Sequence, residues 1–370
     1  MALGERLKQA RNTLGLTQGQ VSELTNLGSS TLSEFESGTR EPKLAQLKRL
    51  ADAYRRPLDY FLADSEPARE VVLWRERPAS PRAEELQCRL LTLARQYHKL
   101  EMLCEERRAH ELPRYEGSVE GFDRSDAIRL AHDFRGKMGL GDRPGLVLLK
   151  VLEEHCKLKV FHMAFEPHGS AACTIDPEGG ASILLNANHN RQQRNSDLAH
   201  ELFHLLTWEV FRKADPITES TAPTHEEKLA DLFAASLLIP EEALRIAVDS
   251  VRGSRTNLGL DDFYDIARQF DVTAEMLLVR MQYVFRIPTD NIRPVIDLAR
   301  EQAKYWEHRD IEPQPPERPA RFNSLADRAF RKALISTGVY AEAMGISRRE
   351  AMRRLDQEPG HNVEINIIDP

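Results

Sequence analysis

The first 62 residues carry apolar positions at the spacing of short amphipathic helices. Intervals of four, three and four residues separate Leu3, Leu7, Ala10 and Leu14, which is the repeat of a helix that buries one face. The same reasoning predicts further helices over residues 18–24 and 29–37 and from about residue 43. Thr17 supplies a cap before the second helix and Gly38 a stop after the third. A tight turn between the second and third helices is typical of a helix-turn-helix.

The middle of the chain changes to the pattern of strands and then returns to that of helices. Segments rich in β-branched and aromatic residues, separated by turn residues, cover 158–165, 171–175 and 181–185. They predict a small sheet of about three strands. The residues that follow are apolar at positions 198, 202, 205 and 206, which indicates a buried helix. The fold class we expect is therefore α+β and mostly helical.

A long helix is predicted between these two regions. Its apolar positions are spaced alternately by four and three residues and comprise Leu86, Leu90, Leu93, Tyr97, Leu100 and Cys104. Such a heptad seam would join two copies of the chain into a homodimer. Alternatively, the same stripe packs onto a neighbouring domain of its own chain, because three heptads are the minimum for a coiled coil.

Proline-rich stretches divide the chain. One spans residues 77–81 and a longer one spans 312–319, and proline excludes helix interiors. We expect a helix-turn-helix domain over 1–64, a linker and long helix over 65–118, a catalytic domain over 119–310, and a proline-rich linker with a helical tail over 311–370.

Composition narrows the class of protein. The chain has 370 residues, ordinary apolar and charged fractions, and a net charge of −7, which argues against coating nucleic acid by bulk charge. Its first residues lack a signal peptide and no long apolar run follows, so we expect a cytoplasmic protein. The four cysteines form no C-x-x-C pair and are expected to be free thiols.

The predicted buried helix contains the pattern H-E-x-x-H as His200, Glu201 and His204. Histidines four apart lie on one face of a helix, so both imidazoles can bind one divalent metal ion. The glutamate between them can then act as a general base. Two hydrogen-bonded core histidines would be the alternative interpretation.

A second helix, near residues 224–240, offers carboxylates for the third ligand of a catalytic zinc site. Glu226, Glu227 and Asp231 all have suitable chemistry. Helical periodicity places Glu227 and Asp231 on one face with small residues and predicts that Glu226 turns away. Periodicity does not choose between Glu227 and Asp231.

The N-terminal region resembles the Xre, or lambda-repressor-like, family. The matching positions are Leu7–Arg11, Leu16–Gln18 and Ser29–Pro42. The resemblance implies DNA reading at the start of the third helix, with two further residues placed for phosphate. The expected DNA contacts are Gln18, Ser29, Ser30, Thr31, Ser33 and Arg40. Residues 1–64 hold only 9 Lys and Arg against 8 Asp and Glu, so a lone copy should bind weakly.

The middle region resembles the ImmA/IrrE family of bacterial metallopeptidases. The motifs that carry this resemblance are Leu185–Asn186, Arg194, Leu198–His204 and Glu227–Pro240. The resemblance implies a metallo-endopeptidase in which Glu227 is the third ligand and Asp231 orients a ligand histidine. Phe203 stands where the family commonly has glycine, which would narrow the substrate cleft.

Together these features predict a regulatory enzyme of a bacterial or phage system, including stress responses. It would use Zn²⁺, or Mn²⁺, held by His200, His204 and Glu227, with Glu201 as base. Its partners would be a repressor or antitoxin substrate and operator DNA, with no membrane. The alternative is a transcriptional regulator or antitoxin whose peptidase-like domain is a sensor or scaffold. His189 and His225 are weaker candidates for stabilising the oxyanion.

Overall fold

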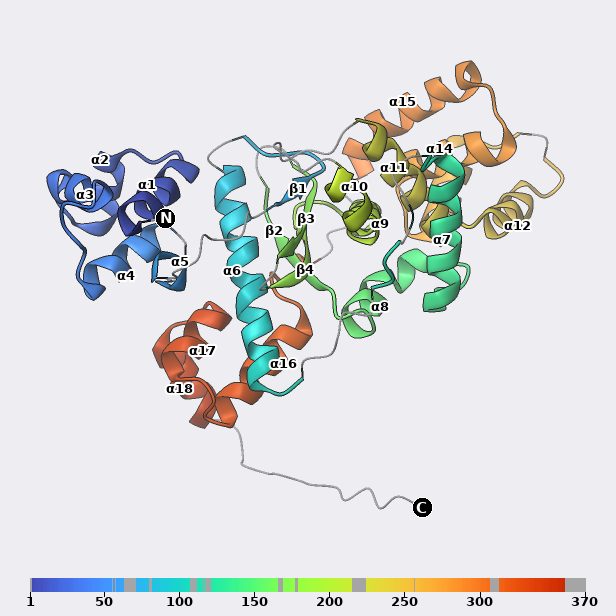
Figure 1. The fold of residues 1–370 in the computed structure, drawn as a ribbon. Helices are drawn as coiled ribbons and strands as arrows, with labels where there is room; N and C mark the ends of the chain where they lie inside the picture. The colour runs from blue at the N-terminus through green and yellow to red at the C-terminus, as the bar shows by residue number, and fades with distance from the viewer. Residues whose placement is uncertain are drawn as a thin grey trace. The chain divides into compact units, whose positions relative to one another are not determined.

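The computed structural model is mostly helical with one small sheet, which confirms the predicted α+β class (Figure 1). It describes residues 2–54, 56, 58–62, 71–79, 82–106, 112–115, 117, 121–165, 169–176, 179–214, 224–255, 257–306 and 313–356. These residues form two compact units, one within 1–95 and 108–319 and the other within 96–107 and 320–370. No helix of the described residues has the length and apolar character needed to cross a membrane.

Five short helices form the N-terminal region. They are α1 (Leu3–Thr13), α2 (Gln18–Thr25), α3 (Ser29–Glu36), α4 (Leu44–Ala53) and α5 (Leu58–Leu62). Thr17 caps α2 by accepting a hydrogen bond from the Gln20 backbone N–H, and Asn26 ends it in the left-handed conformation. The predicted apolar stripe lies in a core shared with the later helices. Asn26 thus ends α2 directly before the turn that leads into α3.

A partly buried ion pair joins α1, α2 and α3. Arg11 donates from Nε and Nη2 to both oxygens of Glu36, at 2.6 and 3.0 Å. The Gln18 amide donates to the same carboxylate at 2.9 Å. Burial alone would raise the pKa of Glu36, but the hydrogen bonds from Arg11 and Gln18 outweigh it and lower that pKa.

The sheet has four strands, one more than the sequence predicted. Its strands are β1 (Leu73–Trp74), β2 (Lys159–Met163), β3 (Ala171–Asp176) and β4 (Gly180–Asn186), in the order β1-β3-β4-β2. β3 is antiparallel to both neighbours, and β2 runs parallel to β4. The additional strand, β1, pairs Leu73 with Cys173. Two residues are too short to show an alternating pattern, so the sequence did not reveal it.

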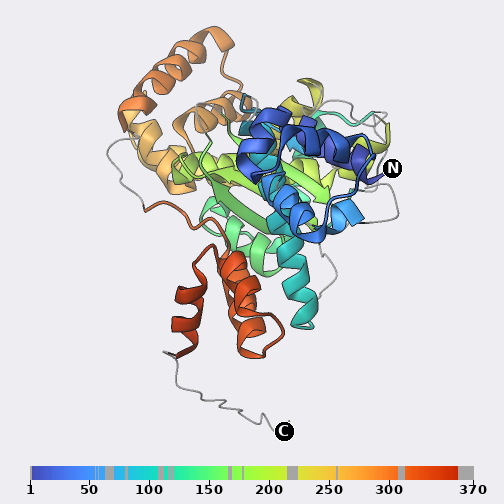
Figure 2. The same cartoon turned by 90° about the vertical axis from the view of Figure 1, so that its left-hand side faces the viewer.

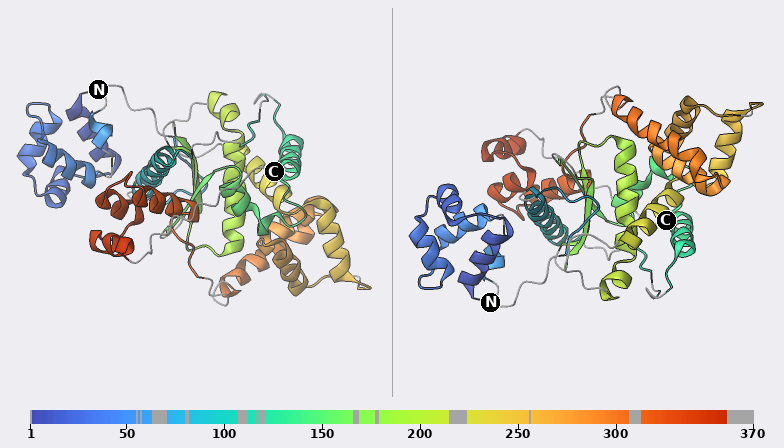
Figure 3. Two further views of the ribbon diagram at one scale, coloured as in Figure 1. Left: turned by 90° about the horizontal axis from the view of Figure 1, so that it is seen from below. Right: turned by 90° about the horizontal axis from the view of Figure 1, so that it is seen from above.

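The first unit contains most of the remaining helices. After α6 (Arg82–Leu103), whose residues are divided between the two units, come α7 (Arg124–Met138), α8 (Leu148–Glu154), α9 (Arg191–Leu206), α10 (Trp208–Ala214), α11 (Thr224–Leu238), α12 (Glu241–Arg252), α13 (Leu260–Phe270), α14 (Ala274–Phe285) and α15 (Thr289–Trp306). Both views of Figure 3 show α9 lying along the sheet, where it packs against β3 and β4. On its other side α9 packs against α11, and α11 also packs against α7. The predicted metal helix is thus the central layer of the unit.

The heptad seam of α6 is buried within the chain. Leu86, Leu90, Leu93, Tyr97 and Leu100 are all nearly inaccessible to solvent. This burial favours the interpretation in which the stripe packs inside one chain. A homodimer formed through this seam would have to displace those contacts.

Three short helices make up most of the second unit (Figure 2). They are α16 (Ala320–Arg331), α17 (Thr337–Met344) and α18 (Arg348–Asp356). Gly345 ends α17 in the left-handed conformation. The Ser347 hydroxyl then accepts from the Glu350 backbone N–H at 3.1 Å. This matches the helical tail expected from the sequence.

Candidate metal centre

Helix α9 presents two histidines and a glutamate from the middle of the buried core. Asn190 caps the helix by accepting from the Gln193 backbone N–H, and α9 begins at Arg191, nine residues before the first histidine. His200, Glu201 and His204 are each at most 2% exposed. The helix is apolar toward the sheet because Leu198 and Leu202 pack there in the main core.

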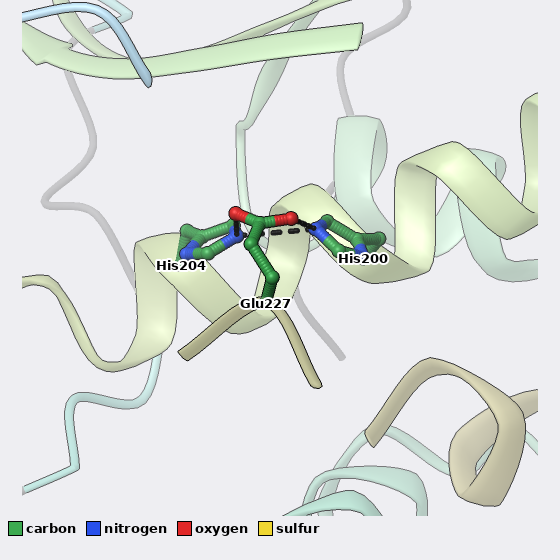
Figure 4. A group of neighbouring side chains, drawn as sticks. All are labelled: His200, His204 and Glu227. Atoms are coloured by element: carbon green, nitrogen blue, oxygen red, sulfur yellow. Dashed lines mark hydrogen bonds and ion pairs between the residues drawn. The ribbon is translucent and has the colours of Figure 1, made fainter. Parts of the chain in front are cut away.

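Glu227 completes a three-residue cluster from α11 (Figure 4). Its Oε2 lies 3.0 Å from His200 Nε2, and its Oε1 lies 3.3 Å from His204 Nε2. The two Nε2 atoms are 3.2 Å apart. Atoms that bind one tetrahedral ion at ~2.0 to 2.1 Å stand about 3.3 to 3.4 Å from one another. The spacing of the two imidazole nitrogens and the two carboxylate oxygens therefore leaves the three side chains close enough to hold one divalent ion.

A second carboxylate supports each histidine from behind. His200 Nδ1 lies 2.9 Å from Asp231 Oδ1, and His204 Nδ1 lies 2.8 Å from Glu226 Oε1. Such contacts fix the ring orientation and leave Nε2 as the ligand atom. The expectation that Glu226 turns away is wrong. Helical periodicity gives the direction in which Glu226 leaves α11, but it does not show which residues of α9 lie in that direction. His204, one turn after His200 on α9, lies there.

Charge in the cluster favours a cation. The carboxylates in or beside it are Asp197, Glu201, Glu226, Glu227 and Asp231, whereas the arginines that contact them are Arg75 and Arg212. Burial alone would lower the pKa of His204, but its hydrogen bonds to Glu226 and Glu227 raise that pKa to about 9. The site thus holds positive charge strongly, and a divalent ion would supply it.

Glu201 differs from the other carboxylates because it has no ion pair and no hydrogen bond of normal geometry in the part of the chain that the structure describes. Both of its oxygens are buried, and neither has a hydrogen-bond partner of normal geometry among the described residues. Burial raises the pKa of Glu201, against the opposing effects of the two histidines and of the Cys173 thiol. Burial also raises the pKa of the Cys173 thiol on β3, and the neighbouring Glu201 carboxylate raises it further. An unpaired buried carboxylate beside the ligands is the arrangement a general base requires.

Asp197 and Arg75 form a supporting network that the sequence did not predict. Asp197, one turn before His200, accepts from Ser170 Oγ at 2.6 Å and lies 2.8 Å from His189 Nδ1. Arg75, directly after β1, donates to Asp197 Oδ1 at 3.0 Å and to Asp231 Oδ1 at 3.1 Å. Arg75 therefore links the edge strand to the carboxylate that holds His200.

Three other sequence candidates fall in distinct places. His189 is tied to Asp197, and His225 is exposed at the start of α11. Phe203 is fully buried and contacts the rings of Phe122 and Phe233. It therefore fills the core, and the expectation that it narrows the substrate cleft is not supported.

The predicted DNA contacts lie on α3 and near its ends. Ser29, Ser30 and Ser33 are exposed, and Thr31 is half-buried. Arg40 is exposed, forms an ion pair with Glu34 at 3.4 Å, and stacks over Phe35. The amide of Gln18 is occupied by Glu36. The side chains on α3 are free to meet a groove, whereas Gln18 has a structural role in addition to any phosphate contact.

Family comparisons agree with both regions. Residues 2–60 match a model described as a helix-turn-helix domain, and residues 153–282 match a peptidase model described as an IrrE N-terminal-like domain. The chain is also 37% identical over 70 residues to the HTH-type transcriptional regulator ImmR of Bacillus subtilis (strain 168). That match covers 19% of this chain and 55% of the regulator, so it spans about half the length of its relative.

Among solved structures, the chain is similar to Bacillus thuringiensis PlcR in complex with a peptide and DNA, at 15% identity. The alignment covers 90% of this chain and 99% of PlcR, with a TM-score of 0.16, which is too low to indicate a shared overall fold. The family models rest on the same residues as the helix-turn-helix and the metal cluster. The chain therefore combines an N-terminal helix-turn-helix domain with a peptidase-type IrrE N-terminal-like domain.

Proposed function

We propose that this protein is a metal-dependent endopeptidase that cleaves a partner repressor or antitoxin and is directed by its helix-turn-helix domain to DNA. The observation that carries this proposal is the convergence of His200 Nε2, His204 Nε2 and a Glu227 oxygen within 4.8 Å of one another. The unpaired Glu201 carboxylate beside them adds the group that hydrolysis needs.

The ligands would hold Zn²⁺ or Mn²⁺, since two imidazoles and a carboxylate suit several divalent ions. Such an ion would act as a Lewis acid on the peptide carbonyl and activate a water molecule. Glu201 would accept a proton from the attacking water and return it to the leaving amine. Asp231 and Glu226 would keep the Nδ1 atoms protonated, so that both Nε2 atoms face the ion.

DNA binding would place the enzyme near its regulatory partner in the cytoplasm. The exposed hydroxyls of Ser29, Ser30 and Ser33 are suited to base edges, and Arg40 to phosphate. Because the N-terminal region is nearly neutral, we infer that two copies act together. The apolar seam of α6 is already buried within the chain, and the two copies would therefore pair through another surface.

The test is a search for new protein termini. Zinc-loaded wild type and Glu201→Gln would each be incubated with a bacterial lysate, and newly formed N-termini would be labelled and identified. The proposal expects termini from a DNA-binding regulator or antitoxin with wild type only. If wild type binds metal and DNA but generates no new terminus in any such protein, the peptidase-like domain is a sensor or scaffold instead.

A further inference from the structure

A large cleft opens beside the metal centre. It has a volume of about 1010 Å³ and is lined by α11, α12, α14 and the start of α7. Asp231, which holds His200 Nδ1, is one of its lining residues. A polypeptide that occupied this cleft would therefore pass within one side chain of the metal ligands.

The cleft is strongly basic although the whole chain carries a net charge of −7. Its cations are Arg124, Lys228, Arg245, Arg280 and Arg286. Its two carboxylates are already paired, Asp231 with Arg75 and Glu241 with Arg245 at 2.8 Å. Apart from Arg245, none of the five cations forms an ion pair with a carboxylate among the described residues. Arg124, Lys228 and Arg286 thus face the cleft without an ion pair, whereas the Glu241 carboxylate acts on Arg280 as well as on Arg245.

Arg280 is the least expected of these cations because it is only 4% exposed. Its Nε donates to the Ile239 carbonyl at 3.1 Å, but its Nη1 is buried and has no hydrogen-bond partner in the described structure. Burial lowers the pKa of this guanidinium, against the opposing effect of the Glu241 carboxylate. A buried guanidinium with an unused donor and no close ion pair destabilises a fold, so an anion from outside would stabilise it.

Arg124 gives an independent indication. It is the first residue of α7, directly after the capping residue Asp123, and the positive end of the helix dipole disfavours a cation there. Its guanidinium reaches the cleft and lies 5.9 Å from the ring centre of Tyr283. Residues that oppose local stability are most often explained by binding.

From these contacts we propose that the cleft binds a segment of the substrate polypeptide in which acidic residues alternate with apolar ones. The cations of the cleft other than Arg245 lie on α7, on α11, on α14 and directly after α14. One small anion would therefore contact only some of them. Apolar side chains lie between them, and among these Val279 and Tyr283 are each 45% exposed. The volume is at the upper end of small-molecule sites. This inference rests on the proposed peptidase function, because it assigns the substrate class of the same site.

The experiment measures binding without turnover. Full-length, zinc-loaded Glu201→Gln would be titrated with a fluorescent peptide of alternating glutamate and leucine or alanine, and with a matched glutamine peptide. Fluorescence anisotropy should show the acidic peptide binding at least about tenfold more tightly, with the difference shrinking at high salt. Lys228→Glu and Arg286→Glu should each weaken acidic-peptide binding by about tenfold, since an attraction becomes a repulsion.

Matched controls separate this cleft from general charge. Lys150→Glu changes an exposed lysine on α8 that does not line the cleft, and it should leave the affinity unchanged. Arg124→Glu should weaken peptide binding while raising the melting temperature, because it removes the cation from the helix N-terminus. A folding defect would instead lower both the peptide affinity and the melting temperature.

Several outcomes would overturn the proposal. Equal affinity for the acidic peptide and the glutamine peptide would contradict it. Equal losses of acidic-peptide affinity in Lys150→Glu and Lys228→Glu would also contradict it. Cleft-dependent binding of inorganic pyrophosphate without peptide binding would assign the site to a small anion. If wild type cleaves its partner and Lys228→Glu cleaves it equally well, the peptidase function stands and the cleft proposal fails. If the acidic peptide binds but wild type cleaves nothing, the cleft proposal stands and the peptidase function fails.

Discussion

Replacing Arg75 by methionine tests whether the edge strand supports the metal site. Arg75 bridges Asp197 and Asp231 through two hydrogen bonds of 3.0 and 3.1 Å, and its side chain is 24% exposed. Asp197 is only 7% exposed, whereas Asp231 is 58% exposed and can regain water. The methionine retains the apolar stem but removes both donors.

The magnitude follows from this difference in burial. A hydrogen bond to a buried charge contributes about 1.5 to 3 kcal/mol, and only the bond to Asp197 counts in full. We expect a loss of about 2 kcal/mol in the free energy of unfolding, equivalent to roughly 4 to 8 °C in melting temperature. Zinc affinity should fall by about tenfold, at the lower end for residues that support ligands, because Asp231 still contacts His200.

The assay is competition for zinc against a chromophoric chelator, together with thermal unfolding. Arg75→Lys should recover only part of the affinity, since an ammonium group cannot span both carboxylates as a guanidinium does. Arg77→Met is the matched control because Arg77 lies in the same segment and, among the described residues, pairs with Glu84 and not with the metal cluster. Zinc affinity and melting temperature equal to those of wild type in Arg75→Met would refute the reasoning.

Three further predictions concern the ligands, the base and the N-terminal helices. Asp231→Asn should weaken zinc binding by roughly 10 to 100-fold in the same competition assay, and an unchanged affinity would show that His200 needs no support. Glu201→Gln should retain its zinc but lose cleavage by roughly 100-fold or more, which full activity of this variant would contradict. The pKa of Glu36 is lower in the folded protein than in the unfolded chain. Its ionised form therefore stabilises the helices at a pH above the pKa of the unfolded chain, and this stabilisation is lost as the pH falls through the pKa of the folded protein. Hydrogen exchange in α1 and α3 should therefore be faster in Glu36→Gln than in wild type at pH 7, with the difference fading below about pH 4; a constant difference would exclude this linkage.

The sequence predicted the candidate metal ligands better than the groups that hold them in place. His200 and His204 follow from their spacing on one helix, and the three long strands follow from composition. The choice of Glu227 came from family resemblance, because periodicity left Asp231 equally suitable. Arg75 could not be predicted, since its strand has two residues and pairs with Cys173 about 100 positions away. Contacts set by tertiary packing leave no local periodic signal.

Metal content shows whether His200, His204 and Glu227 bind an ion. Elemental analysis would compare wild type, Glu227→Ala and Glu201→Gln after reconstitution with zinc and removal of excess ion. We expect about one equivalent in wild type and in Glu201→Gln, and loss of the metal in Glu227→Ala. No bound metal in wild type, or an equal content in Glu227→Ala, would contradict the assignment of His200, His204 and Glu227 as the ligands.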